Sequence, residues 1–249
     1  MIKKIGNQKQ SRDPISNYKC TIISKKMGSG YKWIKKGLII EPNRSLYWSK
    51  THAMIPTPQI IDDGLVKVFY SGRDELNRSH IGYAIVNLSK DCEVIENSYS
   101  PLLSPGELGC FDDNGVTPSC AINLNNNEIG LYYIGWNPGS TVRMHIYGGL
   151  AISKDGGKTF TRWSKAPILE RNRSDPYLNT APWVIKDNDK FRIYYVSGKE
   201  WLNKDTPRYN IKTATSLDGL NWEREGKIAI DFKNKAENAL ARPFVIKEN

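Results

Sequence analysis

Three acidic residues and one histidine occur at the same phase of an internal repeat in this sequence. Asp113, Asp175, Glu237 and His52 each lie five to seven residues before one of four aligned prolines. Cleavage of a glycosidic bond needs one group that protonates the leaving oxygen and a second carboxylate that acts as base or nucleophile. If the repeat brings these side chains together, their types suit that reaction.

The acids can be given separate roles. Glu237 is the candidate general acid, because burial or neighbouring carboxylates would raise its pKa. Asp113, or its neighbour Asp112, is the candidate base or nucleophile, and Asp175 would orient the substrate or tune the pair. His52 could act as a base or bind a hydroxyl or a phosphate. Two alternatives stay open: each acid caps a strand or pairs with an arginine, and His52 is a hydrogen-bonded structural residue.

The repeat that sets this phase is about sixty residues long. Its marker is a proline followed two residues later by a residue that can be buried. The aligned prolines are Pro58, Pro118, Pro182 and Pro243, which are 60, 64 and 61 residues apart. Three such similar intervals argue against chance and for a repeat architecture.

Each repeat predicts short β-strands. Aromatic strands are expected at 66–72, 129–136 and 191–198, and further strands at 81–86, 148–153 and 211–216. Alternating aromatic and β-branched residues indicate strands, and the Gly, Asn and Asp runs between them indicate turns. With about four strands in each repeat and no convincing amphipathic helix, the chain predicts an all-β propeller. The innermost strand of every blade lines the channel of a propeller, so residues one repeat apart should converge there.

A turn motif recurs after the third strand of two repeats, in SKDGGKTFTRW (153–163) and SLDGLNWER (216–224). The first copy resembles the S-x-D-x-G-x-T-[WF] "Asp box" turn of several propeller families. Its Ser and Asp oxygens would accept backbone N–H bonds and its Gly would take a positive φ. We therefore expect structural rather than catalytic roles for Asp155 and Asp218.

The two ends of the chain bear on how a propeller would close. Segment 21–42 matches the tail of a repeat and is expected to complete the last blade, because such closure removes exposed sheet edges. The fourth repeat reaches only Asn249. We expect one domain over 1–249, with repeats starting near 51, 111, 174 and 236, about four blades represented and a truncation at the C-terminus.

The repeat-opening motifs resemble the five-bladed propellers of the glycoside hydrolase family 43, 32 and 130 group. They resemble more closely the hydrolase-like proteins encoded beside genes for bacterial surface polysaccharides. The resemblance rests on THAMIPTP, YSGRDELNRSHIGYAIV, FDDNGVTPSC, YYIGWNPG, SDPYLNTAPWVI, YYVSGKEW, PRYNIKTATSLDGLNW and ENALARPFV. It implies a five-bladed β-propeller and a glycosidase or glycosyl-transferring enzyme. Family 43 enzymes place an Asp base on the first blade, where this sequence has His52, so the three-acid arrangement is not reproduced intact.

Basic and aromatic residues near the strand ends are candidate substrate-binding residues. Besides His52, they are Arg73, Asp74, Arg78, Trp136, Arg208, Tyr209 and Arg242. Guanidinium groups suit carboxylate or phosphate oxygens bidentately, so a charged or phosphorylated sugar is the expected ligand. Trp136 could offer its face to sugar C–H groups, although packing between blades is the alternative.

The composition narrows the range of expected ligands and binding partners. The formal net charge of +10 favours an anionic partner, but the charge is scattered, with its densest group from Lys25 to Lys36, and also fits a solvated surface. No CxxC pair and no His at zinc-ligand spacing accompany the four cysteines, so no metal and no cofactor are predicted. Neither a nucleic-acid motif nor a membrane-spanning segment is evident, and a reducing cytoplasm is the expected location.

Three functions remain. The first is a glycoside hydrolase-like enzyme that acts on a surface or capsular glycan, or its precursor, with a carboxylate acid–base mechanism in the central channel. The second is a sugar transferase or phosphorylase that uses an activated or phosphorylated sugar in polysaccharide biosynthesis. The third is a propeller that binds a glycan without catalysis.

Overall fold

The computed structural model describes residues 19–21 and 34–247, in two units, Met1–Ile39 and Ile40–Asn249. In the first unit, β1 (Lys19–Thr21) pairs with β2 (Ile34–Gly37) in an antiparallel ribbon. Most of the segment expected to complete a closing blade, including residues 22–33, lies outside the described residues.

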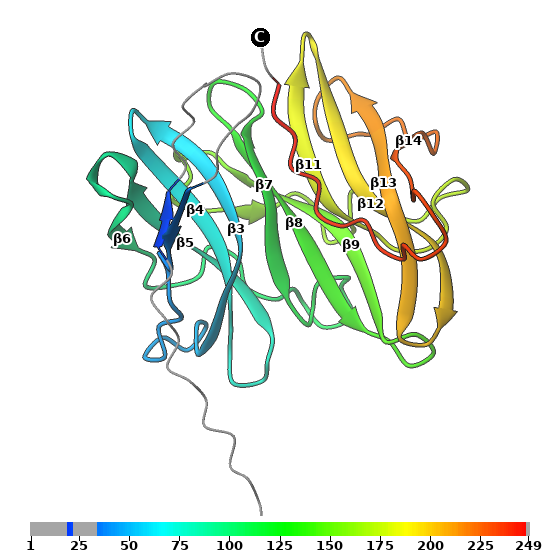
Figure 1. Cartoon of the computed structure of the whole chain (residues 1–249), viewed down its shortest axis with the longest axis horizontal. Coiled ribbons are helices and arrows are strands. Elements are labelled where there is room, and N and C mark those ends of the chain that lie inside the picture. Colours follow the sequence, from blue (N-terminus) through cyan, green and yellow to red (C-terminus); the bar gives the residue numbers. More distant parts are fainter. Residues whose placement is uncertain (1–18, 22–33, 248–249) are drawn as a thin grey trace, which may run out of the picture. The chain divides into compact units, whose positions relative to one another are not determined.

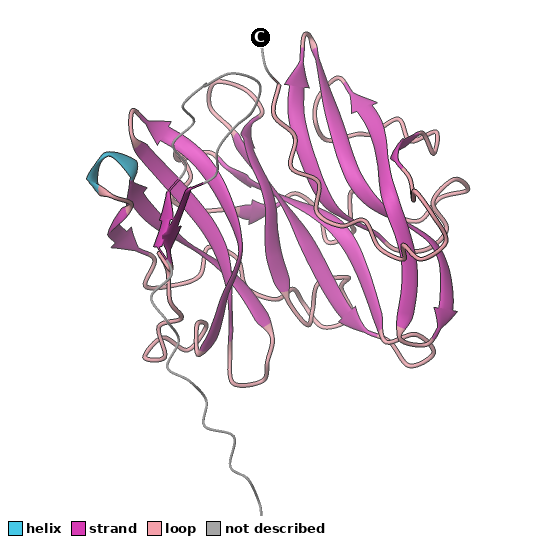
Figure 2. Ribbon diagram, in the orientation of Figure 1, coloured by secondary structure: helices cyan, strands magenta, loops and turns pink. Residues whose placement is uncertain are grey.

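Three sets of four antiparallel strands make up the second unit (Figures 1 and 2). Blade 1 contains β3 (Thr51–Asp62), β4 (Leu65–Arg73), β5 (Ser79–Asn87) and β6 (Glu93–Asn97). Blade 2 contains β7 (Val116–Asn123), β8 (Ile129–Pro138), β9 (Met144–Ser153) and β10 (Thr161–Arg162). Blade 3 contains β11 (Asn179–Asp187), β12 (Lys190–Asn203), β13 (Thr206–Ser216) and β14 (Ile228–Ile230). The expected strands are confirmed.

Helical structure contributes little to this fold. Within the described residues the only helix is a 3-10 turn, η1 (Leu88–Lys90), in the connection between β5 and β6. No helix in that part of the chain is long and apolar enough to cross a membrane.

Neighbouring blades are joined in the same way each time. A parallel bridge links the third strand of one blade to the start of the next repeat, at Ser79↔Gly115, Asn179↔Tyr147 and Tyr209↔Ala239. The first strand of each blade therefore begins at the same end of the unit. The repeat predicted this convergence. Residues about sixty positions apart in the sequence lie at the same end of the second unit.

The hydrophobic core lies between the blades. Phe69 and Ile81 of blade 1 pack with Leu131 and Tyr133 of blade 2 in one cluster of buried side chains. A second cluster joins blade 2 to blade 3, and aromatic side chains are prominent in both. The buried Lys67 of β4 donates from Nζ to the backbone oxygen of Gly157, which adds a polar link between the first two blades.

Both Asp-box turns form as predicted. The Ser153 hydroxyl accepts from the backbone N–H of Gly157 at 2.8 Å, and Asp155 accepts from the N–H and the hydroxyl of Thr159 at 3.0 and 2.6 Å. Hydrogen bonds from Thr159 hold the pKa of Asp155 well below its usual range. These contacts use the carboxylate inside its own turn, which agrees with a structural role.

A buried carboxylate holds the start of blade 2. Asp112, 1% exposed, accepts from the Tyr133 hydroxyl at 2.9 Å and from Arg162 Nε at 2.9 Å. Arg162 also donates to the backbone oxygen of Ser104, so the cluster joins three segments of the chain.

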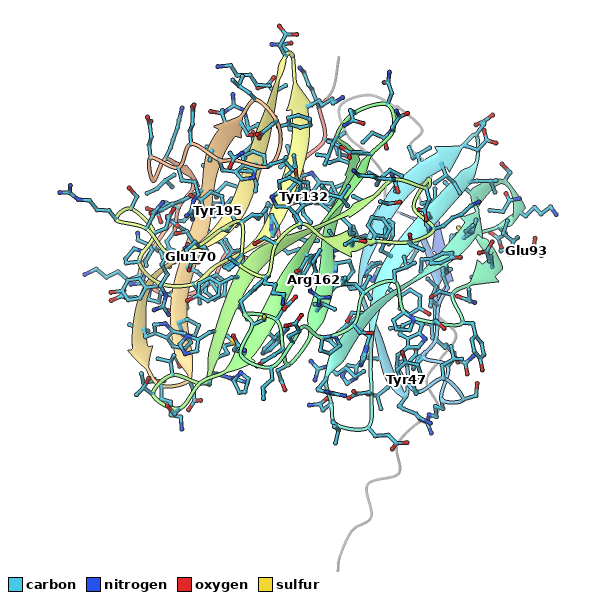
Figure 3. All side chains as sticks on the ribbon, turned by 180° about the vertical axis from the view of Figure 1, so that it is seen from behind. Tyr47, Glu93, Tyr132, Arg162, Glu170 and Tyr195 are labelled. Atoms are coloured by element: carbon cyan, nitrogen blue, oxygen red, sulfur yellow. The ribbon has the colours of Figure 1, made fainter. Side chains whose placement is uncertain are left out.

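Blade 3 repeats this arrangement. Asp175, 0% exposed, accepts from Tyr195 and Ser197 at 2.9 Å and from Lys212 at 2.7 Å, and Arg224 lies 3.6 Å away. Arg162 and Tyr195, labelled in Figure 3, belong to the clusters of these two neighbouring blades. Each cluster ties the residues before an inner strand to the second strand of the same blade.

Asp175→Asn should lower the free energy of unfolding by about 3–5 kcal/mol, because it leaves two buried cations facing a neutral amide. Burial alone would raise the pKa of Asp175, but bonds from Lys212, Tyr195 and Ser197 lower it. The stabilisation is therefore present above about pH 3.9, the ordinary unfolded value, and is lost as the pH falls through the lower folded pKa. Urea unfolding at several pH values measures both effects.

The matched control is Asp189→Asn, because Asp189 is exposed in the turn between β11 and β12. Its effect should stay within about 0.5 kcal/mol. Equal effects of the two substitutions would contradict the structural role assigned to Asp175.

Candidate active site

One cavity of about 260 Å³ lies where the inner strands begin, and all three blades line it. Its aliphatic lining consists of Met54, Ile55, Ile134, Ile146, Leu178, Ala181, Val196 and Ala241. The aromatic and polar lining consists of Arg73, Thr117, Trp136, Thr180, Tyr209 and Arg242. We call this space the axial cavity. Its residues come from four successive repeats, so the fold assembles it from segments far apart in sequence.

The backbone is strained around the axial cavity. Ile55, Ala181 and Arg242 have φ values of 56°, 47° and 51°, and each directly precedes a proline. Positive φ is uncommon for residues other than glycine and is an outlier for β-branched Ile55. Breaks in strand register span Ile55 and Ala181, so a bulge bends the inner strand there. Such strain concentrates at functional sites.

Two half-buried guanidinium groups give the axial cavity its charge. Arg73 donates from Nη1 to Asn77 at 2.8 Å, while its buried Nε has no hydrogen-bond partner. Arg242 donates from Nη2 to the backbone oxygen of Pro56 and to Thr57 at 3.1 Å, and burial lowers its pKa. In the described part of the chain, neither arginine has a carboxylate partner, and no Asp or Glu lines the cavity.

Four of the expected substrate-binding residues share this cavity. Arg73, Trp136, Tyr209 and Arg242 come from β4, β8, β13 and the segment after β14. The structure thus brings together residues that the sequence places as far apart as positions 73 and 242. This is the part of the expected site that converges.

Asp74 and Arg78 contact each other instead of the axial cavity. Asp74 accepts from Arg78 Nε at 3.0 Å and lies 3.2 Å from His80 Nε2, and its other oxygen accepts from the backbone N–H groups of Leu76 and Arg78. Hydrogen bonds from Arg78 and His80 outweigh the effect of burial and lower the pKa of Asp74. The pair shapes the loop that follows Arg73.

His52 and Arg208 also lie outside the lining of the axial cavity. His52 is exposed, with a φ of 65°, and its Nδ1 is 2.9 Å from the hydroxyl of Thr51. Arg208 donates to Glu200 at 2.8 Å and stacks on Phe232. Both are at the strand ends where the sequence placed them, but they do not face this cavity.

The two candidate catalytic acids Asp113 and Glu237 are half-buried and belong to the end of the unit where the inner strands begin. Asp113 accepts from Asn137 Nδ2 and from the backbone N–H of Gly109 at 2.9 Å. Glu237 accepts from the backbone N–H of Lys233 at 2.6 Å. These bonds orient the two carboxylates without removing them from solvent. Asp175, by contrast, is enclosed in its cluster and has no exposed surface.

The contacts correct the phase expected for the first repeat. Gly72 of β4 packs against Ser49, as Gly135 of β8 packs against Asp112, so Ser49 and not His52 holds the place equivalent to Asp112. Asp175 holds this place in the third repeat, where it binds Tyr195 as Asp112 binds Tyr133. The fifth residue after each of these three anchors lines the axial cavity, as Met54, Thr117 and Thr180. By the same count, Glu237 precedes Arg242 by five residues.

Thr117 and Thr180 also line the axial cavity, although they are not among the residues predicted from the sequence. Both are 3% exposed, and the Thr180 hydroxyl is buried without a hydrogen-bond partner. A signal was present, because a threonine stands one or two residues before the aligned proline in each of the first three repeats. In the second and third repeats this threonine lines the axial cavity, whereas in the first repeat Met54 and not Thr57 does.

The chain was compared with family models, with curated sequences and with solved structures. No family model matches the chain. A solved glycoside hydrolase superposes with a TM-score of 0.60 and 17% identity, covering 78% of this chain and 60% of that one. Zg3597, a family 117 glycoside hydrolase of Zobellia galactanivorans, superposes with a TM-score of 0.54 and 16% identity, covering 79% and 52%. The chain thus spans about three fifths or less of these two structures.

These likenesses confirm the predicted fold, an all-β propeller of the kind found in the glycoside hydrolase family 43, 32 and 130 group. The count of five blades stays a prediction. In sequence, the chain is 36% identical over 217 residues to the uncharacterized protein Rv1502 of Mycobacterium tuberculosis (strain ATCC 25618 / H37Rv), covering 87% of this chain and 72% of the relative. The protein MT1551 of strain CDC 1551 / Oshkosh matches over the same shares. The chain therefore belongs to the family of Rv1502 and has the β-propeller fold of glycoside hydrolases.

Proposed function

We propose that this protein binds an anionic sugar unit in the axial cavity and acts on a surface or capsular glycan or its precursor. The observation that carries the proposal is the pair Arg73 and Arg242, which share a cavity and have no carboxylate partner among the described residues. A charge that is partly removed from water is costly unless it is paired. A carboxylate or phosphate on the ligand would supply the missing partner, and the guanidinium fork suits both.

Aromatic groups beside the arginines fit the neutral part of such a ligand. Trp136 and Tyr209 line the same cavity. A ring face packs against apolar C–H groups, while the Tyr hydroxyl can exchange hydrogen bonds with a sugar hydroxyl. The combination of ring and guanidinium groups therefore favours an acidic carbohydrate over a simple inorganic anion.

Hydrolysis by Asp113 and Glu237 is a second proposal. It is supported by their half-burial, by the place of Asp113 three residues before β7 and by the place of Glu237 five residues before Arg242; neither acid lines the axial cavity. Glu237 would give a proton to the leaving oxygen as the glycosidic C–O bond breaks. Asp113 would take a proton from the water that attacks the sugar carbon. Asp175 has no part in this step, because its carboxylate is enclosed by Tyr195, Ser197 and Lys212.

The arginines also support the alternative of a phosphorylase or transferase. Arg73 and Arg242 could hold a phosphate that attacks the sugar or leaves from it. Turnover that depends on added phosphate or on a nucleotide sugar would identify that reaction, and binding without turnover would identify a glycan-binding propeller.

Arg73→Gln and Arg242→Gln should each weaken binding of glucuronate oligosaccharides by about 10- to 100-fold, since a hydrogen bond to a charged group contributes about 1.5–3 kcal/mol. Binding of the neutral glucose oligosaccharides should change little. Isothermal titration calorimetry measures both ligands.

The control for these variants is Arg192→Gln, which makes the same change of charge at the opposite end of blade 3, where Arg192 pairs with Asp187 at 3.0 Å. Equal losses in the control and in the cavity variants, or no loss in any, would contradict anion binding by Arg73 and Arg242.

Asp113→Asn and Glu237→Gln should each lower turnover of an acidic capsular polysaccharide by about 100-fold or more, while affinity for the glycan is kept. Release of reducing ends, with and without phosphate, measures turnover, and urea unfolding shows whether either variant loses stability instead. Asp189→Asn is the control. Unchanged turnover in both variants would reject hydrolysis by this pair, and lost stability in Glu237→Gln alone would indicate an anchoring role like that of Asp175.

A further inference from the structure

An exposed tryptophan follows the outermost strand of blade 2. Trp163 comes directly after β10 and is 53% exposed, whereas the other tryptophans that the structure describes are buried or half-buried. Its backbone N–H donates to the backbone oxygen of Leu150 in β9 at 2.8 Å, so its main chain is held on the sheet. Single exposed apolar residues are common on protein surfaces, so the surroundings of this ring decide what it does.

The propeller fold does not require an aromatic residue at this position. The strand after each Asp box begins with a bridge, at Thr161 in blade 2 and at Glu223 in blade 3, to the residue just before the serine of the box. Two residues further along the chain stand Trp163 and Glu225, and both are exposed. The buried aromatic residue of the first turn is a different one, Phe160. Blade packing therefore does not explain the ring of Trp163.

Two hollows meet at Trp163. One has a volume of about 330 Å³ and is bordered by Glu128 and Lys154. The other has a volume of about 560 Å³ and is bordered by Glu107 and Lys165. Trp163 and both residues of β10 line the two hollows, which we together call the outer groove. It shares no lining residue with the axial cavity, so it is a separate surface.

The size of the outer groove suits a ligand longer than one sugar. Each hollow is within the range of roughly 300–1,000 Å³ that is usual for small-molecule sites. Because the same ring borders both, a ligand stacked on Trp163 can extend into both hollows. A chain of several sugar units has this form.

The cations around the outer groove already have carboxylate partners. Lys154 lies 3.2 Å from Glu128, and Lys165 lies 2.8 Å from Glu107. Arg162 is paired with the buried carboxylate that anchors blade 2. The outer groove therefore offers no unpaired cation to an anion, unlike the axial cavity with its two arginines. The lysines and Glu107 are largely exposed, so their polar ends can still exchange hydrogen bonds with sugar hydroxyls.

This composition favours a glycan over a protein partner. Charged residues are depleted from the core of protein–protein interfaces, whereas here two ion pairs border a single exposed ring. A sugar presents apolar C–H groups to a ring face and hydroxyls at its edges. Trp163 with the ion-paired side chains beside it offers the complementary arrangement.

We propose that the outer groove binds a neutral stretch of a glycan chain, with one sugar ring stacked on Trp163 and neighbouring units in the two hollows. This binding site goes beyond the proposed function, because it uses neither the arginines of the axial cavity nor the candidate catalytic acids.

An array of neutral and acidic glycans, probed with the whole protein, tests this inference. Calorimetry then measures the affinities of the neutral glycans that bind. A neutral tetrasaccharide should bind about 10-fold tighter or more than the monosaccharide of the same sugar, because it reaches both hollows. Trp163→Ala should weaken binding of the tetrasaccharide by about 10-fold or more, and Trp163→Phe, which keeps a ring, should weaken it less.

Tyr99→Ala is the matched control, since Tyr99 is 82% exposed and lines neither hollow. Tyr99→Ala and Arg73→Gln should both bind the neutral tetrasaccharide as the wild type does. A loss in either of them as large as that in Trp163→Ala would overturn the inference. Because Trp163 is exposed, Trp163→Ala should unfold at the same urea concentration as the wild type within about 0.5 kcal/mol of stability.

The wild type and Trp163→Ala give the remaining outcomes. No neutral glycan bound by the wild type, or equal affinity for monosaccharide and tetrasaccharide, would overturn the inference. A wild-type oligomer that dissociates in Trp163→Ala, measured by light scattering, would also overturn it and make Trp163 a contact between copies of the chain. Binding of neutral glycans without any preference for acidic ones at the axial cavity would reject the proposed function alone.

Discussion

Buried carboxylates at the start of the inner strands are the constraint on which the axial cavity depends. Asp112 and Asp175 each bind a tyrosine of the second strand and at least one cation. The chain enters the inner strand within five residues of each anchor, and there the pairing of Thr117 with Ile134 and of Thr180 with Val196 fixes the fifth residue. Those fifth residues are Thr117 and Thr180, which line the cavity. The packing of the blades therefore sets the positions of groups that could touch a ligand.

The sequence could predict the repeat, the strands and four of the residues that line the candidate site, because these follow from local patterns. Prolines and aromatic strands recur in phase, and Arg73, Trp136, Tyr209 and Arg242 stand at strand ends that a propeller brings together. Turn motifs are equally local, since all the hydrogen bonds of Asp155 lie within its own turn.

The position of the acids within each repeat was harder to predict. Bulges change the number of residues between an anchor and the aligned proline. Pro58 follows its anchor Ser49 by nine residues, whereas Pro118 and Pro182 follow Asp112 and Asp175 by six and seven. The register of β3 against β4 shifts three times, and each bulge adds a residue that an alignment on prolines cannot detect. His52, with its positive φ, lies in this region. Counting back from Pro58 therefore reaches His52 instead of Ser49, which holds the place that Asp112 and Asp175 hold in the next two repeats.

The loop after β4 shows a second limit of sequence reasoning. Asp74 and Arg78 have the chemistry of ligand-binding residues, but they are four positions apart in a tight loop and satisfy each other. Their contact still bears on the cavity, because Asn77, in the same loop with a φ of 62°, accepts from Arg73. The Asp74–Arg78 contact shapes this loop, and the loop in turn orients Arg73 through Asn77.

Carboxylates pair with some of the arginine and lysine side chains of the second unit and leave others without a carboxylate partner among the described residues. The anchors Asp112 and Asp175 neutralise Arg162 and Lys212 inside the blades, and Asp74 does the same for Arg78 in its loop. Arg73 and Arg242 are left facing the cavity, where burial lowers the pKa of Arg242. A bound anion would lower the cost of placing two half-buried cations on one largely apolar wall, and so would stabilise the strained segment at Arg242.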